Sequence, residues 1–145
     1  PTDLADVLQR LADAYGDGDF RIHWQLPAMF PSLDMPEGAL DAVLSTFITN
    51  SRLAGANEIR LLACEQQDRI TLTIADNGSG IAPADREQIF EPFFTTHREA
   101  GGSGLGLSIA RSLVIASGGT LELKDSEEGT TFVIEIPIAA PSAVS

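Results

Sequence analysis

Apolar residues recur every three or four positions in several stretches of the chain, and this spacing predicts amphipathic helices. The first stretch covers residues 4–15 and ends at the glycines of Gly16–Gly18. The longest covers residues 36–54, and Asp34 and Glu37 have the spacing of a capping box at its start. We therefore expect two helices in the first third of the chain, the second starting from an Asp34 cap.

The second half of the chain carries two further helical patterns. Residues 83–90 begin with a proline and predict a short helix. Residues 105–117 predict a longer helix, which Gly118 and Gly119 terminate.

Between the helices, short stretches rich in β-branched and other apolar residues predict strands. These stretches are residues 20–26, 58–65, 69–75, 120–124 and 131–138. The order of elements favours an α/β protein, more closely an α+β two-layer sandwich, with a mixed, mostly antiparallel sheet and helices on one face. We expect one domain over residues 1–138 and a flexible tail over residues 139–145.

Composition narrows the function. The formal net charge is −12 and Lys124 is the only lysine, which argues against nucleic acid as a partner. A polyphosphate ligand would therefore need a local source of positive potential, such as a metal ion, loop amides or a helix N-terminus. Cys64 is the only cysteine, so an internal disulfide and a multi-cysteine zinc site are excluded.

No apolar run approaches the roughly 20 residues that span a bilayer, and no signal peptide opens the chain. The chain begins at Pro1, so we expect a fragment of a longer protein. The expected location is the cytoplasm, with room for a membrane anchor in the full-length protein.

Asp76 follows an apolar strand and precedes Gly78 and Gly80. A carboxylate at a strand end can accept a hydrogen bond from the exocyclic amine of adenine, whereas guanine presents an oxygen there. The neighbouring glycines let the backbone approach a ligand closely. The same residues are also common in a plain tight turn.

Three other segments carry candidate chemistry. Asn50 lies late in an apolar helix and offers a carboxamide oxygen, a ligand type that Mg²⁺ accepts. Residues 101–107 form a glycine-rich loop that runs into a helix, where free amides and the helix dipole favour anions. Residues 90–96 hold three of the seven phenylalanines and suit either a small satellite core or the hinge of a mobile lid over Thr95–Ser103.

Together these segments resemble the GHKL superfamily, and within it the ATP-binding domains of bacterial sensor histidine kinases. Five boxes match in order: Asn50 (N box), Asp76 to Gly80 (G1 box), Phe90 to Thr96 (an F box of the nitrogen-regulator type), Gly102 to Leu107 (G2 box) and Gly129 to Phe132.

The resemblance implies a Bergerat fold that binds Mg-ATP between the helix bearing Asn50 and a glycine lid. Asp76 would hold adenine, Asn50 would hold Mg²⁺ and Thr130 would approach the adenine. The γ-phosphate would pass to a histidine on a separate dimerisation domain, in signalling to a response regulator receiver domain. The other residues implied around the nucleotide are Ala54, Gly78, Gly80, Ile81, Phe93, His97, Gly102, Gly104, Leu105, Gly106 and Leu107.

The chain departs from this family at several positions. Thr46 stands where ATP-hydrolysing relatives have a glutamate base and histidine kinases usually have asparagine, so we expect slow hydrolysis. Leu53 and His97 replace residues that are often lysine, which leaves Arg52 and His97 as basic candidates for the phosphates.

The two histidines are poor phosphoacceptors, since His23 lies in a predicted strand and His97 in the lid. Three alternatives remain open. One is a serine kinase of the anti-sigma-factor type, and another is a non-catalytic nucleotide-binding or partner-docking module. The third is an ATP-driven clamp like the gyrase and chaperone relatives, against which Thr46 argues.

Overall fold

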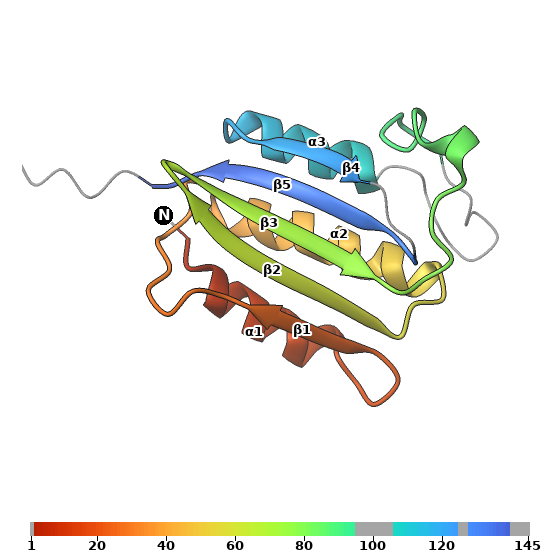
Figure 1. The fold of residues 1–145 in the computed structure, drawn as a ribbon, viewed down its shortest axis with the longest axis horizontal. Helices are drawn as coiled ribbons and strands as arrows, with labels where there is room; N and C mark the ends of the chain where they lie inside the picture. Colours follow the sequence, from red (N-terminus) through yellow and green to blue (C-terminus); the bar gives the residue numbers. More distant parts are fainter. Residues whose placement is uncertain (1, 95–105, 125–127, 140–145) are drawn as a thin grey trace, which may run out of the picture.

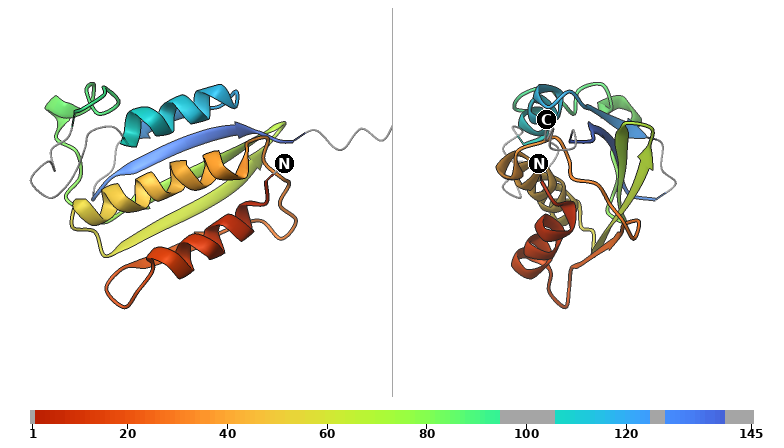
Figure 2. Two further views of the ribbon diagram at one scale, coloured as in Figure 1. Left: turned by 180° about the vertical axis from the view of Figure 1, so that it is seen from behind. Right: turned by 90° about the vertical axis from the view of Figure 1, so that its left-hand side faces the viewer.

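A computed structural model describes residues 2–94, 106–124 and 128–139. Three helices lie side by side across one face of a five-stranded sheet (Figures 1 and 2). The elements are α1 (Leu4–Tyr15), β1 (Arg21–Gln25), α2 (Glu37–Leu53), β2 (Glu58–Gln66), β3 (Arg69–Asp76), the 3₁₀ turn η1 (Pro83–Asp85), α3 (Gly106–Ala116), β4 (Thr120–Lys124) and β5 (Thr131–Pro137).

The strands follow the order β1-β2-β3-β5-β4. Only β1 and β2 are parallel, with Trp24 opposite Leu61, and α2 provides the crossover that a parallel pair requires. The other three pairs are antiparallel. The predicted two-layer α/β architecture with a mixed, mostly antiparallel sheet is therefore confirmed.

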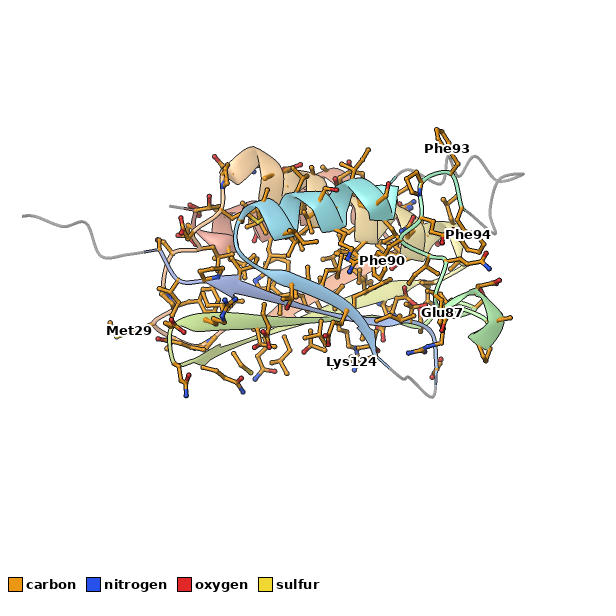
Figure 3. The ribbon with its side chains drawn as sticks, turned by 90° about the horizontal axis from the view of Figure 1, so that it is seen from above. Met29, Glu87, Phe90, Phe93, Phe94 and Lys124 are labelled. Atoms are coloured by element: carbon orange, nitrogen blue, oxygen red, sulfur yellow. The ribbon has the colours of Figure 1, made fainter. Side chains whose placement is uncertain are left out.

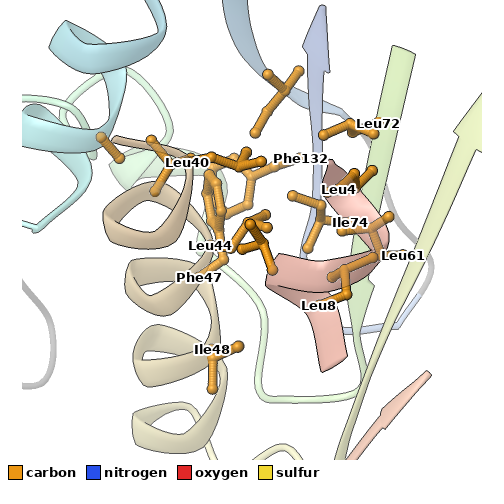
Figure 4. Packing of buried hydrophobic residues seen from close by; sticks show 14 of the residues in the cluster. Leu4, Leu8, Leu40, Leu44, Phe47, Ile48, Leu61, Leu72, Ile74 and Phe132 are labelled. Carbon is orange, nitrogen blue, oxygen red and sulfur yellow. The ribbon is translucent and has the colours of Figure 1, made fainter. Parts of the chain in front are cut away.

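The core lies between the helices and the inner face of the sheet. In β3 and β5 every second residue is buried, which is the pattern of a sheet covered on one side. Phe47 of α2 packs against Phe132 of β5, with ring centroids 4.8 Å apart. Figure 4 shows side chains from α1, α2 and the sheet converging there: Leu4, Leu8, Leu40, Leu44, Phe47, Ile48, Leu61, Leu72, Ile74 and Phe132.

The predicted Asp34 cap of the second helix is wrong. The N-cap is Pro36, and no side chain caps the helix. The backbone N–H of Asp34 instead donates to the carbonyl of Pro137, beside the bridge that joins Leu33 to Ile138. Glu37 pairs with Arg10 of α1 at 2.9 Å. Pairing of this segment with the end of β5 thus overrides the local capping preference.

The short helix predicted over residues 83–90 is also wrong. Only Pro83–Asp85 forms a helical turn, and the residues after it form turns. The backbone bonds run from the N–H of Asp85, Gln88, Glu91 and Phe94, each to the carbonyl three residues earlier. Ile89, within these tight turns, is buried.

None of the helices in the described part of the chain has the length and apolar character of a membrane span. Ala139 donates its backbone N–H to the carbonyl of Ser32. Residues 140–145 lie outside the described residues, so the flexible tail over residues 139–145 stays a prediction.

Candidate functional site

Segments far apart in the sequence meet at one end of the sheet, on the right in Figure 1. The last turn of α2, the end of β3 and the approach to β5 come together there, and Gly106 at the start of α3 lies against Thr46 of α2. Asp76, the last residue of β3, stands at the centre of this junction.

Three donors hold the carboxylate of Asp76. Its Oδ1 accepts from the backbone N–H of Gly78 at 2.9 Å and of Thr130 at 3.1 Å. Its Oδ2 accepts from the hydroxyl of Ser51 at 2.6 Å. The backbone of Asp76 is also paired, since its N–H donates to the carbonyl of Thr130 at 2.9 Å. The carboxylate is therefore fixed in direction before any ligand arrives.

Glycines are required around this carboxylate because there is no room for a side chain. A Cβ on Gly129 would lie 1.9 Å from the carbonyl oxygen of Asp76, and Gly129 has φ +68°. A Cβ on Gly78 would lie 2.9 Å from the Cβ of Ala54. Gly80 has φ +80°, and its Cβ would lie 3.0 Å from the carbonyl oxygen of Gly129. The backbone thus crowds around Asp76 while the carboxylate stays half-exposed.

Asn77 holds the loop between α2 and β2 against this end of the sheet. Its side-chain oxygen accepts from the backbone N–H of Asn57 at 3.0 Å and of Glu58 at 3.2 Å. Its amide donates to the side-chain oxygen of Asn57 at 2.6 Å. The backbone N–H of Ser79 donates to the carbonyl of Ala54 at 2.9 Å. The turn after β3 is thereby tied to the end of α2.

Asn50 and Thr46 lie one turn apart on α2, both half-buried. The hydroxyl of Thr46 donates to the carbonyl of Ala42 at 2.8 Å, so its proton is committed within the helix. A Cβ on Gly106 would lie 3.1 Å from the Cγ2 of Thr46, so the start of α3 comes close to α2 at this point. Thr46 therefore packs against α3, and its neutral hydroxyl is a poor base.

Ser51 is a site residue that the sequence analysis missed. Its side chain is buried, with 2% exposure, and its hydroxyl bonds to Asp76. The sequence does indicate a buried role for Ser51. It follows Leu44 and Phe47 on the apolar stripe of α2, where a polar residue needs a buried partner.

The phenylalanines of the F-box segment divide into two groups. The ring of Phe90 packs edge-on against Phe132 at 6.2 Å, and the guanidinium of Arg111 lies 5.2 Å above it. Phe94 also packs against the core. Phe93 is 64% exposed with φ +68°, and Figure 3 shows it at the outer tip of the segment. Phe90 and Phe94 therefore pack on the main core and do not form a separate satellite core, and the hinge role stays a prediction.

Arg52, a basic candidate for phosphate, is engaged elsewhere. It donates to the carbonyl of Tyr15 at 2.7 Å, lies 3.5 Å from the carboxylate of Asp17 and stacks over Phe20 at 4.9 Å. Hydrogen bonds from the backbone of Asp19 and Phe20, and then Arg52, lower the pKa of Asp17. Arg52 thus ties α2 to the turn between α1 and β1.

His23 lies in β1, as predicted, 3.7 Å from the carboxylate of Glu58. Ile81 is half-buried against the core and Leu107 lies in the first turn of α3. Four predicted ligand-binding residues lie outside the described residues: His97, Gly102, Gly104 and Leu105. The same holds for the predicted lid over Thr95–Ser103.

Within residues 2–94, 106–124 and 128–139, no three His, Cys, Asp or Glu side chains gather closely enough to form a metal site of their own.

Residues 36–140 match the family model of histidine kinase-, DNA gyrase B- and HSP90-like ATPases. The matched range contains Asn50, Asp76 and Thr130 together with the glycines that surround them. The chain belongs to this family.

Relatives within this ATPase family agree with that assignment. The two-component sensor PprA of Pseudomonas aeruginosa is 40% identical over 71% of the chain, and the sensor histidine kinase CpxA of Escherichia coli is 35% identical over 77%. The chain spans only 12% and 25% of these two proteins. The ATP-binding domain of PrrB from Mycobacterium tuberculosis superposes with a TM-score of 0.77 at 25% identity, over 96% of each chain.

Proposed function

We propose that the chain binds Mg-ATP and acts as the catalytic domain of a protein-histidine kinase. The carboxylate of Asp76 carries the proposal. It is held by three donors at the end of a strand, and glycines keep the backbone around it bare of side chains. A pre-oriented acceptor of this kind suits a base that bears an exocyclic amine.

The preference for adenine follows from hydrogen-bond chemistry. An ionised carboxylate has about four acceptor positions, and Ser51, Gly78 and Thr130 use three of them. The fourth remains for one more donor. Adenine supplies an amine, whereas guanine has an oxygen at that position, so two acceptors would face each other. An unpaired buried acceptor costs about 1–3 kcal/mol, enough to select ATP over GTP.

Asn50 is the proposed protein ligand of Mg²⁺. It lies on α2 one residue before Ser51, which bonds to Asp76, and its side chain leaves from a different face of the helix. When bound, Mg²⁺ neutralises charge on the phosphates. The fit rests on the carboxamide oxygen of Asn50, a ligand type that Mg²⁺ accepts.

The proposed acceptor is a histidine on a separate dimerisation domain, and the proposed onward partner is a response regulator receiver domain. His23 lies in a strand beside Glu58, which does not present it to this site. Water is the other acceptor, and the neutral hydroxyl of Thr46, which donates to the carbonyl of Ala42, is a poor base for activating it. Transfer needs an acceptor held in line with the γ-phosphate, so the domain alone should turn ATP over slowly.

The names of PprA, CpxA and PrrB support this proposal, since they describe a two-component sensor, a sensor histidine kinase and an ATP-binding domain. The cytoplasm, where ATP is available, is the proposed location of the domain.

Calorimetry with Mg-ATP and Mg-GTP tests the base-binding site. The wild-type chain should bind Mg-ATP more tightly, and Asp76→Asn should lose about tenfold or more in affinity for it. Asp68→Asn is the matched control, because Asp68 is an exposed residue in the β2–β3 turn at the other end of the sheet. Equal wild-type affinities for the two nucleotides would contradict the assignment.

Labelled ATP tests the transfer. Label should appear only when a dimerisation domain bearing a histidine is supplied with the chain. Binding of ATP without any transfer under those conditions would favour the non-catalytic nucleotide-binding module, and strong label on the isolated chain would favour a self-contained kinase.

A further inference from the structure

Among the described residues, the hydroxyl of Ser51 makes the only side-chain hydrogen bond between α2 and the Asp76 carboxylate. The Oγ–Oδ2 distance is 2.6 Å, in the range of a strong hydrogen bond to an ionised acceptor. Ser51 is 2% exposed, so water does not readily replace this donor. The bond also joins residues 25 positions apart in the sequence.

The two oxygens of Asp76 are held in different ways. Oδ1 takes both of its donors from the backbone, at Gly78 and Thr130, and no side-chain substitution removes them. Oδ2 takes its donor from the side chain of Ser51. Without that hydroxyl, the carboxylate is anchored through one oxygen only and can rotate about it.

Rotation matters because the remaining acceptor position is useful only in one direction. A carboxylate held at both oxygens keeps that position fixed, so binding a donor costs little further conformational entropy. A carboxylate held at one oxygen spreads the position over a range of angles. The hydroxyl of Ser51 therefore acts on a ligand through Asp76.

We propose that Ser51 is a positioning residue that sets the selectivity of this site for a base bearing an exocyclic amine. The proposal rests on the proposed function, because it assumes that Asp76 accepts from that amine. Ser51 lies beside Asn50 in α2, so one helical turn supplies both the proposed metal ligand and the group that orients the base acceptor.

The test compares Ser51→Ala with Ser45→Ala. Ser45 lies on the same helix, and its hydroxyl donates to the carbonyl of Ala42 at 3.1 Å, away from Asp76. Calorimetry measures two ligands, Mg-ATP and the Mg-triphosphate of purine riboside, which has hydrogen in place of the amine. Ser51→Ala should weaken Mg-ATP by about 5- to 10-fold and leave the amine-free ligand within about twofold. Ser45→Ala should change neither.

A second readout needs no ligand. The backbone amides of Gly78 and Thr130 donate to Oδ1 of Asp76, so their ¹H–¹⁵N resonances report the orientation of the carboxylate. Both resonances should shift in Ser51→Ala and remain in place in Ser45→Ala. Ser51→Cys keeps a group of similar shape with a weaker donor, so it should give an intermediate loss of Mg-ATP affinity even if Ser51→Ala folds poorly.

Two outcomes overturn the proposal. Equal losses for both ligands mean that Ser51 supports the fold and does not act on the amine, and unchanged Mg-ATP affinity means that Oδ1 alone orients Asp76. A failure of the proposed function looks different, because the wild-type chain would then bind the two triphosphates equally.

Discussion

The substitution Gly129→Ala tests the assembly of the site most directly. The added Cβ would lie 1.9 Å from the carbonyl oxygen of Asp76 and 2.8 Å from its Oδ1. Ordinary contact begins at 3.4 Å, so the backbone must shift by about 3.4 − 1.9 = 1.5 Å. Neither oxygen is the end of a flexible chain that could swing aside cheaply, because the carbonyl belongs to β3 and Oδ1 is held by two amides.

The expected cost has two parts. The φ of +68° at Gly129 costs an L-residue about 1–2 kcal/mol. The shift also breaks the two bonds between Asp76 and Thr130, at about 1 kcal/mol each. We expect the free energy of unfolding to fall by about 3–4 kcal/mol and the melting temperature to fall by roughly 10 °C.

Urea unfolding, with the midpoint and slope fitted together, measures this loss. Two glycines serve as controls. Gly55 has φ +80° but open space around its Cβ, so Gly55→Ala should show the backbone cost alone. Gly38 lies in α2 with open space, so Gly38→Ala should raise the free energy of unfolding by up to about 1 kcal/mol. If Gly129→Ala costs no more than Gly55→Ala, the close approach to Asp76 is not a constraint.

Two further predictions follow from side chains near the same end of the sheet. Asn50→Ala should weaken binding of Mg-ATP several-fold and leave adenosine binding unchanged, because the metal proposed at Asn50 would contact the phosphates of the nucleotide and not its nucleoside. Calorimetry with both ligands checks this, and parallel losses would make Asn50 a structural residue. The second concerns Asp17, whose pKa is lowered in the folded state by the backbone of Asp19 and Phe20 and by Arg52. Its stabilising contribution is complete at pH 7 and is lost as the pH falls below about 4, through the folded-state pKa. Asp17→Ala should therefore have a lower free energy of unfolding than the wild type at pH 7. Denaturant unfolding at pH 3 should show a smaller difference in free energy between the two proteins. A difference that is constant with pH would show that the charge of Asp17 does not contribute.

Periodicity was sufficient to predict the sheet and the long helices. The alternation in β3 and β5 reflects burial on one face, and the helical spacing in α1 reflects a single buried stripe, so both patterns are properties of the local sequence. The order of the glycines around Asp76 likewise indicated where a ligand would be held, because tight turns and close approaches need particular residues.

The failures lie where distant segments decide the outcome. Aspartate is a common N-cap residue, but the backbone of Asp34 pairs with the end of β5. Ser51 contributes through a partner 25 positions away, and Arg52 is used by the α1–β1 turn and not by the site. The local sequence marks Ser51 as a polar residue on an apolar stripe, but it names none of these partners. Residues 83–90 differ in kind, because helical and 3₁₀ spacing are hard to separate over so few residues.

The position of β5 affects the order in which the parts of the site form during synthesis. The strand nearest the end of the chain is inserted between β3 and β4, and the residue just before it, Thr130, supplies a donor to Asp76. During synthesis the chain emerges from its N-terminus, so every helix is complete before this donor exists. A nascent or truncated chain that ends before Thr130 has the acceptor without one of its anchors. Ligand affinity at this carboxylate should therefore report whether β5 has paired with β3. A nucleotide bound there would stabilise only chains in which this pairing is complete.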